Sequence, residues 1–315
     1  MKMFSKINFL NIFLLFCLTS LIVISCKNNQ QDANKLEETI LQGEITVSVD
    51  ETVQPIIEDE IAVFENQYKA KINQINKPET EIINDLINQK ATVAVLSRKL
   101  TESEEAIFRT RKILSRPTLF ASDAIVLLTN KKTKDTVVDL QEVINLMQQK
   151  RSKIKGLVFE NQNSSTINYM NKLAGVSNAP KKGVYALNSH EDVLKYVINN
   201  PEVIGVVGLN LIVQPTEKLA PYLSQLKVVG VKNSKSKSDN QNYYKPSQSN
   251  LGAGKYPLSR ELYLLNYQGK IGLGMGFASF IAGEVGQRVV LKSGLLPAYV
   301  PTRIINIRKE LEIKK

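Results

Sequence analysis

The chain has almost no histidine and few cysteines. Among its 315 residues, His190 is the single histidine, and we predict it to be exposed in the first turn of a helix, beside the cap Ser189. One imidazole cannot build a multi-histidine metal centre, and every Ser-His-Asp triad would depend on this same base. We therefore expect a protein that is not an enzyme and that contains neither a metal nor another cofactor.

The two cysteines lie near the N-terminus, in the pattern of a secretory signal. Lys2 and Lys6 precede an apolar run, Ile7 to Ser25, which contains Cys17 and ends immediately before Cys26. A basic start, an apolar stretch and small residues before a cleavage point are typical of such signals. With cysteine at that point, the segment resembles a bacterial lipoprotein signal, which implies removal of residues 1–25 and acylation of Cys26. The mature chain then has no disulfide and no cysteine nucleophile.

The same apolar run permits a second interpretation, an uncleaved transmembrane anchor, since about 17–25 apolar residues can span a bilayer. Asn8 and Asn11 inside the run make such a span less favourable. Either interpretation places the folded body at the cell envelope, anchored to a membrane and facing the periplasm or the exterior. Residues 26–42 are polar and are predicted to form a flexible tether.

Basic residues exceed acidic ones, but not in the arrangement that nucleic acids require. The net charge is +11, and the lysines are scattered instead of forming a stripe interleaved with aromatic residues. We expect no nucleic-acid partner. A solvated basic surface favours small anions.

Strand and helix patterns alternate from residue 43 onward. Strands are predicted at 45–49, 91–97, 119–130, 156–160, 203–208 and 256–266, with helical periodicity between most of them. The nearly unbroken apolar run at 91–97 is typical of a parallel strand that is covered on both faces. A long exposed loop is expected at 233–255, and one helix around Phe277–Leu291. This rhythm predicts an α/β fold with a largely parallel sheet.

Three hydroxyl residues mark a candidate oxyanion site. Ser164, Ser165 and Thr166 follow one predicted strand and begin a helix. The first backbone N–H groups of a helix have no internal partner, so hydroxyls and amides together can bind an anion there. The alternative is simple capping of the helix, because serine and threonine are usual caps.

Two other strand ends carry polar residues of the same kind. Thr52 follows the first strand and is placed to donate to a ligand, whereas Asp50 is better suited to capping the next helix. Arg98 follows the strand at 91–97 and is placed for an anion, because ligands of open α/β sheets bind at the carboxyl ends of strands. The alternative for Arg98 is an ion pair with Glu102, Glu104 or Glu105.

Seven segments in order, from about Gly43 to Pro301, resemble the phosphate-type substrate-binding proteins of ABC importers, in the lipoprotein form found in bacteria. The most distinctive are a Tyr-Pro-Leu-x-Arg strand and a later Gly-Gln followed by Gly-x-x-Pro. The segments are ITVSVDETVQPI, AVLSRKLTESE, LFASDAIVLLTN, NSSTINYM, IGVVG, YYKPS…GKYPLSRELYLL and GFASFIAGEVGQRVVLKSGLLP.

The resemblance implies a type II periplasmic-binding-protein-like fold, with two lobes joined by a hinge of crossing strands and the ligand in the cleft between them. Lobe I is expected at 43–119 and 256–315, and lobe II at 120–255. The ligand contacts implied are Thr52, the pair Thr80 and Glu81 at the start of the second helix, and Ser164 and Thr166 together with the backbone of Ser165.

The chain departs from the family pattern near these contacts. Glu160 stands four positions before Ser164, where the family often has arginine, and Ser165 replaces the glycine of Ser-Gly-Thr. The family's acidic acceptor for the phosphate proton is expected near Thr92, where this chain has no acid. The resemblance implies a solute-binding lipoprotein that binds a small oxyanion, phosphate foremost, and delivers it to an ABC permease. The alternative is a non-transport lipoprotein that uses the same fold as an interaction or sensing module.

Overall fold

The computed structural model describes residues 38–237 and 239–300. The signal predicted at 1–25, the acylation site Cys26 and most of the predicted tether at 26–42 lie outside the described residues. Within the described ranges, no helix combines the length and the hydrophobicity needed to cross a membrane.

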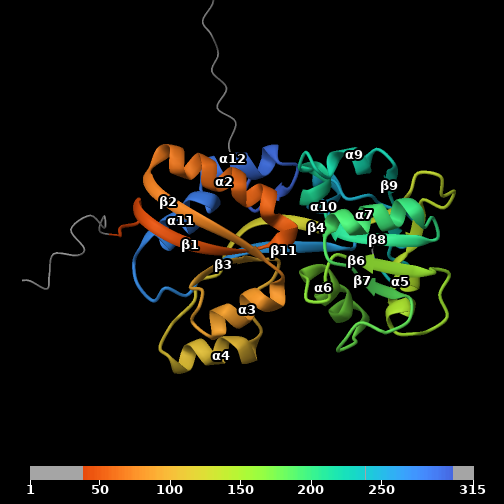
Figure 1. Ribbon diagram of the computed structural model, residues 1–315, viewed down its shortest axis with the longest axis horizontal. Helices are drawn as coiled ribbons and strands as arrows, with labels where there is room; N and C mark the ends of the chain where they lie inside the picture. Colours follow the sequence, from red (N-terminus) through yellow and green to blue (C-terminus); the bar gives the residue numbers. More distant parts are fainter. Residues whose placement is uncertain (1–37, 238, 301–315) are drawn as a thin grey trace, which may run out of the picture. The chain divides into compact units, whose positions relative to one another are not determined.

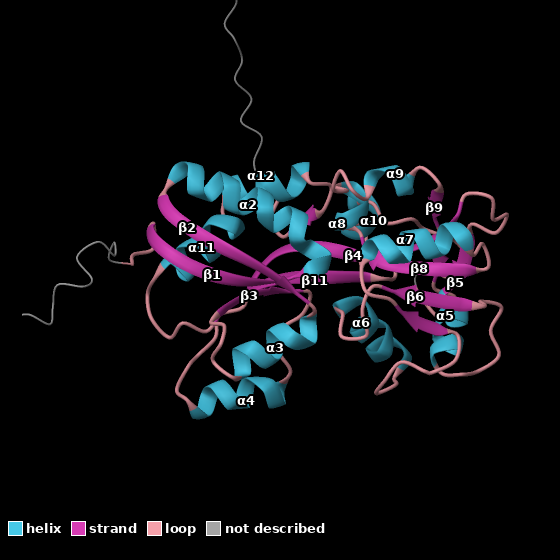
Figure 2. Cartoon of the chain, viewed as in Figure 1, coloured by secondary structure: helices cyan, strands magenta, loops and turns pink. Residues whose placement is uncertain are grey.

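Twelve strands and eleven α-helices make up the described part of the chain (Figures 1 and 2). The strands are β1 (Gln42–Asp50), β2 (Lys69–Lys77), β3 (Val93–Leu96), β4 (Thr118–Asn130), β5 (Val137–Asp139), β6 (Gly156–Phe159), β7 (Val184–Ala186), β8 (Val203–Gly208), β9 (Leu226–Val228), β10 (Gly230–Lys232), β11 (Ser259–Asn266) and β12 (Leu296–Pro297). The helices are α2 (Gln54–Gln67), α3 (Glu79–Ile87), α4 (Glu102–Thr110), α5 (Leu140–Met147), α6 (Ser165–Ala174), α7 (His190–Asn199), α8 (Asn210–Val213), α9 (Ala220–Leu223), α10 (Gln248–Gly252), α11 (Leu273–Ala282) and α12 (Glu284–Lys292), and a 3₁₀ turn, η1 (Glu51–Val53), follows β1.

Ten of the strands form one mixed sheet in the order β2-β1-β3-β11-β4-β8-β6-β7, and β9 and β12 also pair with β4. The β1–β3 strands are parallel to one another, as are β6–β8, whereas β11 and β4 run antiparallel to their neighbours. The first half of β4 pairs with β11 and its second half with β8 and β9. The long β4 therefore belongs to both halves of the sheet, as expected of a strand that crosses between lobes. The lobe boundaries themselves stay predictions.

The core follows the burial pattern that the sequence indicates. Every residue of β3 and of β6 is buried, as expected for strands covered on both faces. Helices α2, α11 and α12 lie on one side of β1–β3, and α3 and α4 on the other (Figure 1). On the first side, the rings of Phe64 and Phe277 meet edge to face at 5.3 Å, and on the second, Phe108 stacks on Tyr267 at 4.0 Å.

Three local expectations differ from the structure. The single helix expected around Phe277–Leu291 is two helices, because the chain is extended at Gly283 between α11 and α12. The loop expected at 233–255 contains the short helix α10. Strand β2 was not predicted from the sequence. It lies at the edge of the sheet, and Ile72 is its one buried residue, so its sequence shows no alternation of apolar and polar residues.

Helix α2 buries one acid, Glu60, whose two carboxylate oxygens have no hydrogen-bond partner in the described part of the chain. Burial, reinforced by the nearby Asp59, raises the pKa of Glu60 to about 9. The unfolded chain ionises this carboxyl near its ordinary pKa of about 4.3. Stability is therefore lost progressively as the pH rises from about 4.3 to about 9.

We predict that Glu60→Gln raises the free energy of unfolding at pH 8 by on the order of 1–3 kcal/mol, because the amide cannot ionise in the unfolded state. The gain should be much smaller at pH 5. Denaturant unfolding at the two pH values measures both, with the exposed Glu58→Gln on the same helix as the control. An equal effect of Glu60→Gln at pH 5 and pH 8 would contradict the assignment.

Candidate ligand-binding site

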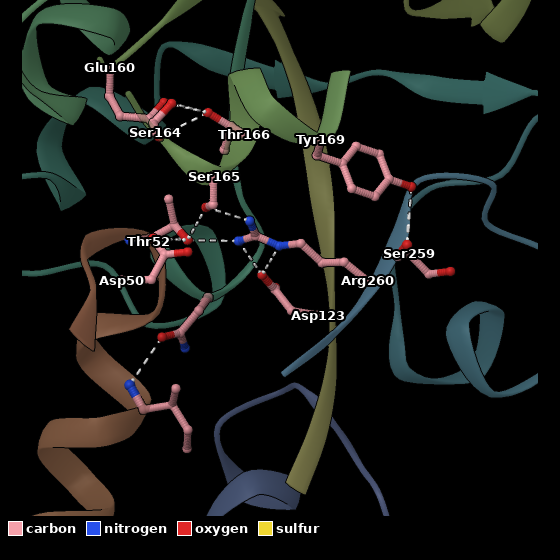
Figure 3. Close-up of polar contacts among 12 residues, drawn as sticks. Asp50, Thr52, Asp123, Glu160, Ser164, Ser165, Thr166, Tyr169, Ser259 and Arg260 are labelled. Carbon is pink, nitrogen blue, oxygen red and sulfur yellow. Dashed lines mark hydrogen bonds and ion pairs between the residues drawn. The ribbon is translucent and has the colours of Figure 1, made fainter. Parts of the chain in front are cut away.

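Side chains from four elements meet where β1 and β6 end (Figure 3). Thr52 lies in η1 directly after β1, and Ser165 is the first residue of α6 after β6. Asp123 lies in β4 and Arg260 in β11. We call these four residues the anion seat.

The turn after β1 is held by Asp50, which caps η1. Its Oδ1 accepts from the backbone N–H of Thr52 at 3.0 Å and from Thr52 Oγ1 at 2.9 Å. This is the capping role that the sequence favours for Asp50. The second carboxylate oxygen, Oδ2, is buried and has no hydrogen-bond partner among the described residues.

At the start of α6, one hydroxyl caps the helix and two others contact neighbouring elements. Ser164 is the N-cap and accepts from the backbone N–H of Ile167 at 3.4 Å. Thr166 Oγ1 lies 2.9 Å from Ser164 Oγ and donates to the Glu160 carboxylate at 2.9 Å. Ser165 points instead toward Thr52, with 3.2 Å between their hydroxyl oxygens. The capping interpretation therefore applies to Ser164, whereas the oxyanion-binding role of the segment stays a prediction.

Arg260 joins the two hydroxyls. Its Nη2 donates to Thr52 Oγ1 at 2.8 Å and its Nη1 to Ser165 Oγ at 2.9 Å, while Nε and Nη2 donate to Asp123 Oδ2 at 2.9 Å and 2.6 Å. Only 4% of the Arg260 surface is exposed, and Asp123 is fully buried. Burial opposes the charge on Arg260, but Asp123 and Asp50 outweigh this effect and hold its pKa above the ordinary value. The seat therefore contains a permanent, buried positive charge.

Strand β8 approaches the seat closely at its last residue, Gly208. A Cβ at this position would lie 2.9 Å from Arg260 Nη2 and 3.0 Å from the Thr52 carbonyl oxygen. Real Cβ atoms essentially never come this close, so the guanidinium takes its position because residue 208 has no side chain.

Sequence reasoning missed Arg260 and Asp123 as site residues. The signals were present: Arg260 is the arginine of the Tyr-Pro-Leu-x-Arg strand, and Asp123 is a lone acid inside the apolar run 119–130. Acids and arginines are almost never fully buried unless they are paired. Asp123 and Arg260 carry opposite charges in two strands that are predicted to be buried, so an ion pair between them could have been predicted.

The remaining predicted contacts lie around the seat. The Thr80 backbone N–H donates to the Asn163 carbonyl at 3.2 Å, and Thr80 Oγ1 accepts from Asn168 at 3.3 Å, beside the start of α6. Glu81 is exposed on α3. In the described part of the chain, no hydrogen bond links Glu81 to the seat.

Arg98 forms an ion pair with Glu104, one of the three glutamates named as alternative partners in the sequence analysis. Its Nη1 and Nη2 bind the Glu104 carboxylate at 2.9 Å and 3.0 Å, and its Nε binds Glu79 at 3.0 Å. Glu79 also accepts from Asn168 at 3.1 Å. Arg98 therefore contacts α6 through Glu79 and has no direct hydrogen bond to the seat among the described residues. Its predicted role as a ligand contact stays a prediction.

His190 corrects a sequence expectation. It opens α7 as predicted, but it is half-buried instead of exposed, and both ring nitrogens are inaccessible. Burial lowers the pKa of His190, and the nearby Glu51 carboxylate opposes this effect. Burial also raises the pKa of Glu51 and of Glu160 to about 7. The helix pattern alone could not show that α7 begins against two glutamates from other elements.

Comparison with known proteins gives the class of this fold. Residues 34–285 match the model of the PBP superfamily domain, so the chain belongs to the PBP superfamily. The periplasmic-binding-protein-like α/β fold predicted from the sequence is thereby confirmed. No curated protein matches the chain.

Solved structures of this class superpose on most of the chain. A putative phosphate ABC transporter substrate-binding protein from Clostridium perfringens, with bound phosphate, has a TM-score of 0.64 at 17% identity and covers 82% of this chain and 100% of its own. An ABC-type phosphate transport receptor from Vibrio cholerae has a TM-score of 0.60 at 18% identity, covering 81% and 100%. A possible phosphate-binding protein from Planctomyces limnophilus has a TM-score of 0.54 at 20% identity, covering 82% and 93%. At these identities the similarity establishes the fold.

We predict that Arg260→Met lowers the free energy of unfolding by about 3–5 kcal/mol, because it leaves Asp123 buried without its partner. The double variant Arg260→Met with Asp123→Leu should recover most of this loss, since it removes both charges. Denaturant unfolding of the wild type, both single variants and the double variant forms the complete cycle. Additive losses in the double variant would contradict the pairing.

Proposed function

We propose that the protein is an extracytoplasmic solute-binding protein that captures a small oxyanion, phosphate foremost, and delivers it to an ABC importer. The observation that carries this proposal is the buried Arg260 guanidinium. It donates to the hydroxyl of Thr52 in η1 and to the hydroxyl of Ser165 at the start of α6. The named functions of the similar Clostridium and Vibrio structures support it.

Three kinds of donor favour an oxyanion at this seat. A guanidinium binds planar or tetrahedral oxyanions through paired, charge-assisted hydrogen bonds. The first amides of α6, at Ser165 and Thr166, have no acceptor within the helix, and the helix dipole adds about 0.3–1 kcal/mol for an anion at this end. The two hydroxyls add neutral donors. An oxyanion would replace the direct contact between Thr52 and Ser165. To donate to it, Thr52 would turn its single hydroxyl proton away from Asp50 Oδ1, which keeps its bond from the Thr52 backbone N–H.

Asp50 supplies a reason for phosphate in particular. Monohydrogen phosphate carries an O–H group, which needs an acceptor, whereas sulfate carries none at neutral pH. The buried Oδ2 of Asp50 has no partner among the described residues and lies on the turn that holds Thr52. We propose that it accepts the phosphate proton, in place of the acid that was expected near Thr92.

Binding in this seat would also hold the two halves of the sheet together. Thr52 follows β1 in one half, and Ser165 follows β6 in the other. Two further contacts join the same halves beside the seat. The Ile56 backbone N–H donates to buried Asn210 at 3.0 Å, and Thr80 N–H to the Asn163 carbonyl. A ligand that bridges Thr52 and Ser165 would therefore favour the closed arrangement.

The N-terminal pattern supports a location at the cell envelope. We propose that residues 1–25 are a signal sequence and that acylated Cys26 anchors the mature protein to a membrane of the cell envelope. Two or more acyl chains give stable anchoring where one does not. The anchor would keep the binding body near its permease.

We predict that the purified protein binds phosphate in calorimetric titration and that Thr52→Val and Ser165→Ala each weaken binding by about tenfold to a hundredfold. This follows because a hydrogen bond to a charged group contributes about 1.5–3 kcal/mol. Ser249→Ala, which changes an exposed serine of α10, is the matched control. If the wild type binds no phosphate, or if both seat variants bind it as well as the control does, the proposed function is wrong.

We predict that Asp50→Asn weakens phosphate binding at least tenfold and improves sulfate binding, because an amide nitrogen cannot accept the phosphate proton. Asparagine also caps helices well, so the turn after β1 is retained. Competition between phosphate and sulfate at pH 8 measures the ratio of the two affinities. A ratio equal to that of the wild type would exclude Asp50 as the proton acceptor.

A further inference from the structure

A second polar cluster lies next to the anion seat and consists of Glu51, Glu160 and His190. One carboxylate oxygen from each glutamate and one ring nitrogen of His190 all lie within 4.8 Å of one another. The three residues come from separate elements: η1 after β1, the position after β6, and the first residue of α7. The fold therefore brings together one imidazole and two carboxylates that are far apart in the sequence.

The hydrogen bonding of this cluster is incomplete. Both ring nitrogens of His190 are buried, and neither makes a well-formed hydrogen bond in the described part of the chain, although the Glu51 backbone interacts with the ring. Buried polar groups ordinarily have partners, and each exception calls for an explanation. Glu160 is 1% exposed, and Thr166 holds its carboxylate by hydrogen bonds of 2.9 Å to both oxygens. A cation between the three side chains would give one ring nitrogen of His190 a partner.

The surrounding charges favour a cation of high charge. Glu51 is within electrostatic reach of Glu160, Asp50 and Glu81. Arg260 is the positive group that acts on both Glu160 and His190. The start of α7 is also positive; of the two acids in its first turn, Glu191 is already paired with Lys195 and Lys218, and Asp192 has no such ion pair among the described residues. Carboxylates thus outnumber cationic groups around the cluster.

We propose that Glu51, Glu160 and His190 bind a divalent transition-metal ion of the zinc class, and that this ion adds positive charge beside the anion seat. One histidine and two carboxylates form a donor set that zinc accepts, with a fourth position open to water or another ligand. Tetrahedral ligands about 2.1 Å from zinc lie about 3.4 Å apart, so the side chains need to close by little more than an ångström. The first part of the proposal is independent of the proposed function, and the second part rests on it.

The proposed metal site departs from the sequence-based expectation that the protein contains no metal. That expectation excluded sites with several histidines, and His190 was predicted to be exposed. Hydrogen bonds from Thr166 to Glu160 have the further role of orienting a ligand, as second partners of metal ligands commonly do.

Zinc titration of the metal-stripped protein, produced without a polyhistidine tag, tests the site. We expect one tightly bound zinc per chain, with the affinity lowered at least tenfold in each of Glu51→Gln, Glu160→Gln and His190→Ala. Glu217→Gln, which changes an exposed glutamate, should leave the affinity unchanged. Wild-type affinity in all three cluster variants would overturn the proposal.

A second measurement on the unmodified protein avoids any dependence on the folding of variants. Because His190 is the single histidine, the imidazole region of the ¹H–¹⁵N spectrum reports on this ring alone. One equivalent of zinc should shift the ¹⁵N resonance of the ligating nitrogen. An unchanged imidazole spectrum at saturating zinc would overturn the proposal.

Phosphate titration with and without bound zinc tests the second part. We expect zinc to strengthen phosphate binding about fivefold or more, as is typical of coupled sites, and His190→Ala to remove this gain. Equal phosphate affinity in the two states would overturn the coupling. Zinc binding without any phosphate binding would support the metal site and contradict the proposed function, so the two failures are distinguishable.

Discussion

The buried ion pair between Arg260 and Asp123 is the interaction on which the rest of the site depends. Burying a guanidinium is costly, and Asp123 makes it tolerable by pairing with it from the neighbouring strand β4. The pair fixes Arg260 across the sheet so that its remaining N–H groups reach Thr52 and Ser165. Arg260, which lies in strand β11, thus supplies the positive charge of the seat, whereas Thr52 and Ser165 come from a turn and from a helix N-terminus. The same arrangement requires Gly208 to lack a side chain.

The acids around the seat divide into different roles. Asp123 neutralises Arg260, whereas Asp50 caps the turn that positions Thr52 and keeps one oxygen for a ligand. Glu160 and Glu51 lie close to each other and to His190. So many carboxylates weaken the attraction of the seat for an anion, and further positive charge would offset this effect. The proposed metal ion and the proposed anion are therefore electrostatically complementary, because each reduces the cost of burying the other.

The sequence predicted the fold, and it singled out two of the four residues of the candidate anion seat, Thr52 and Ser165. Apolar runs and helix periodicity identify strands such as β8 and the start of α6, because these signals are local. Strand β2 and the break at Gly283 were missed, since an edge strand and a glycine between two helices leave weak local patterns. Arg260 was missed, and His190 was wrongly expected to be exposed, for another reason. Their roles depend on partners distant in the sequence, and no local pattern shows that a charged residue will be buried against them.

The most direct measurement is a crystal structure of the protein grown with phosphate. The account predicts one phosphate between the two halves of the sheet, within hydrogen-bond distance of the Arg260 guanidinium and of the Thr52 and Ser165 hydroxyls. A phosphate bound elsewhere, with the hydroxyls still in direct contact with Arg260, would contradict it.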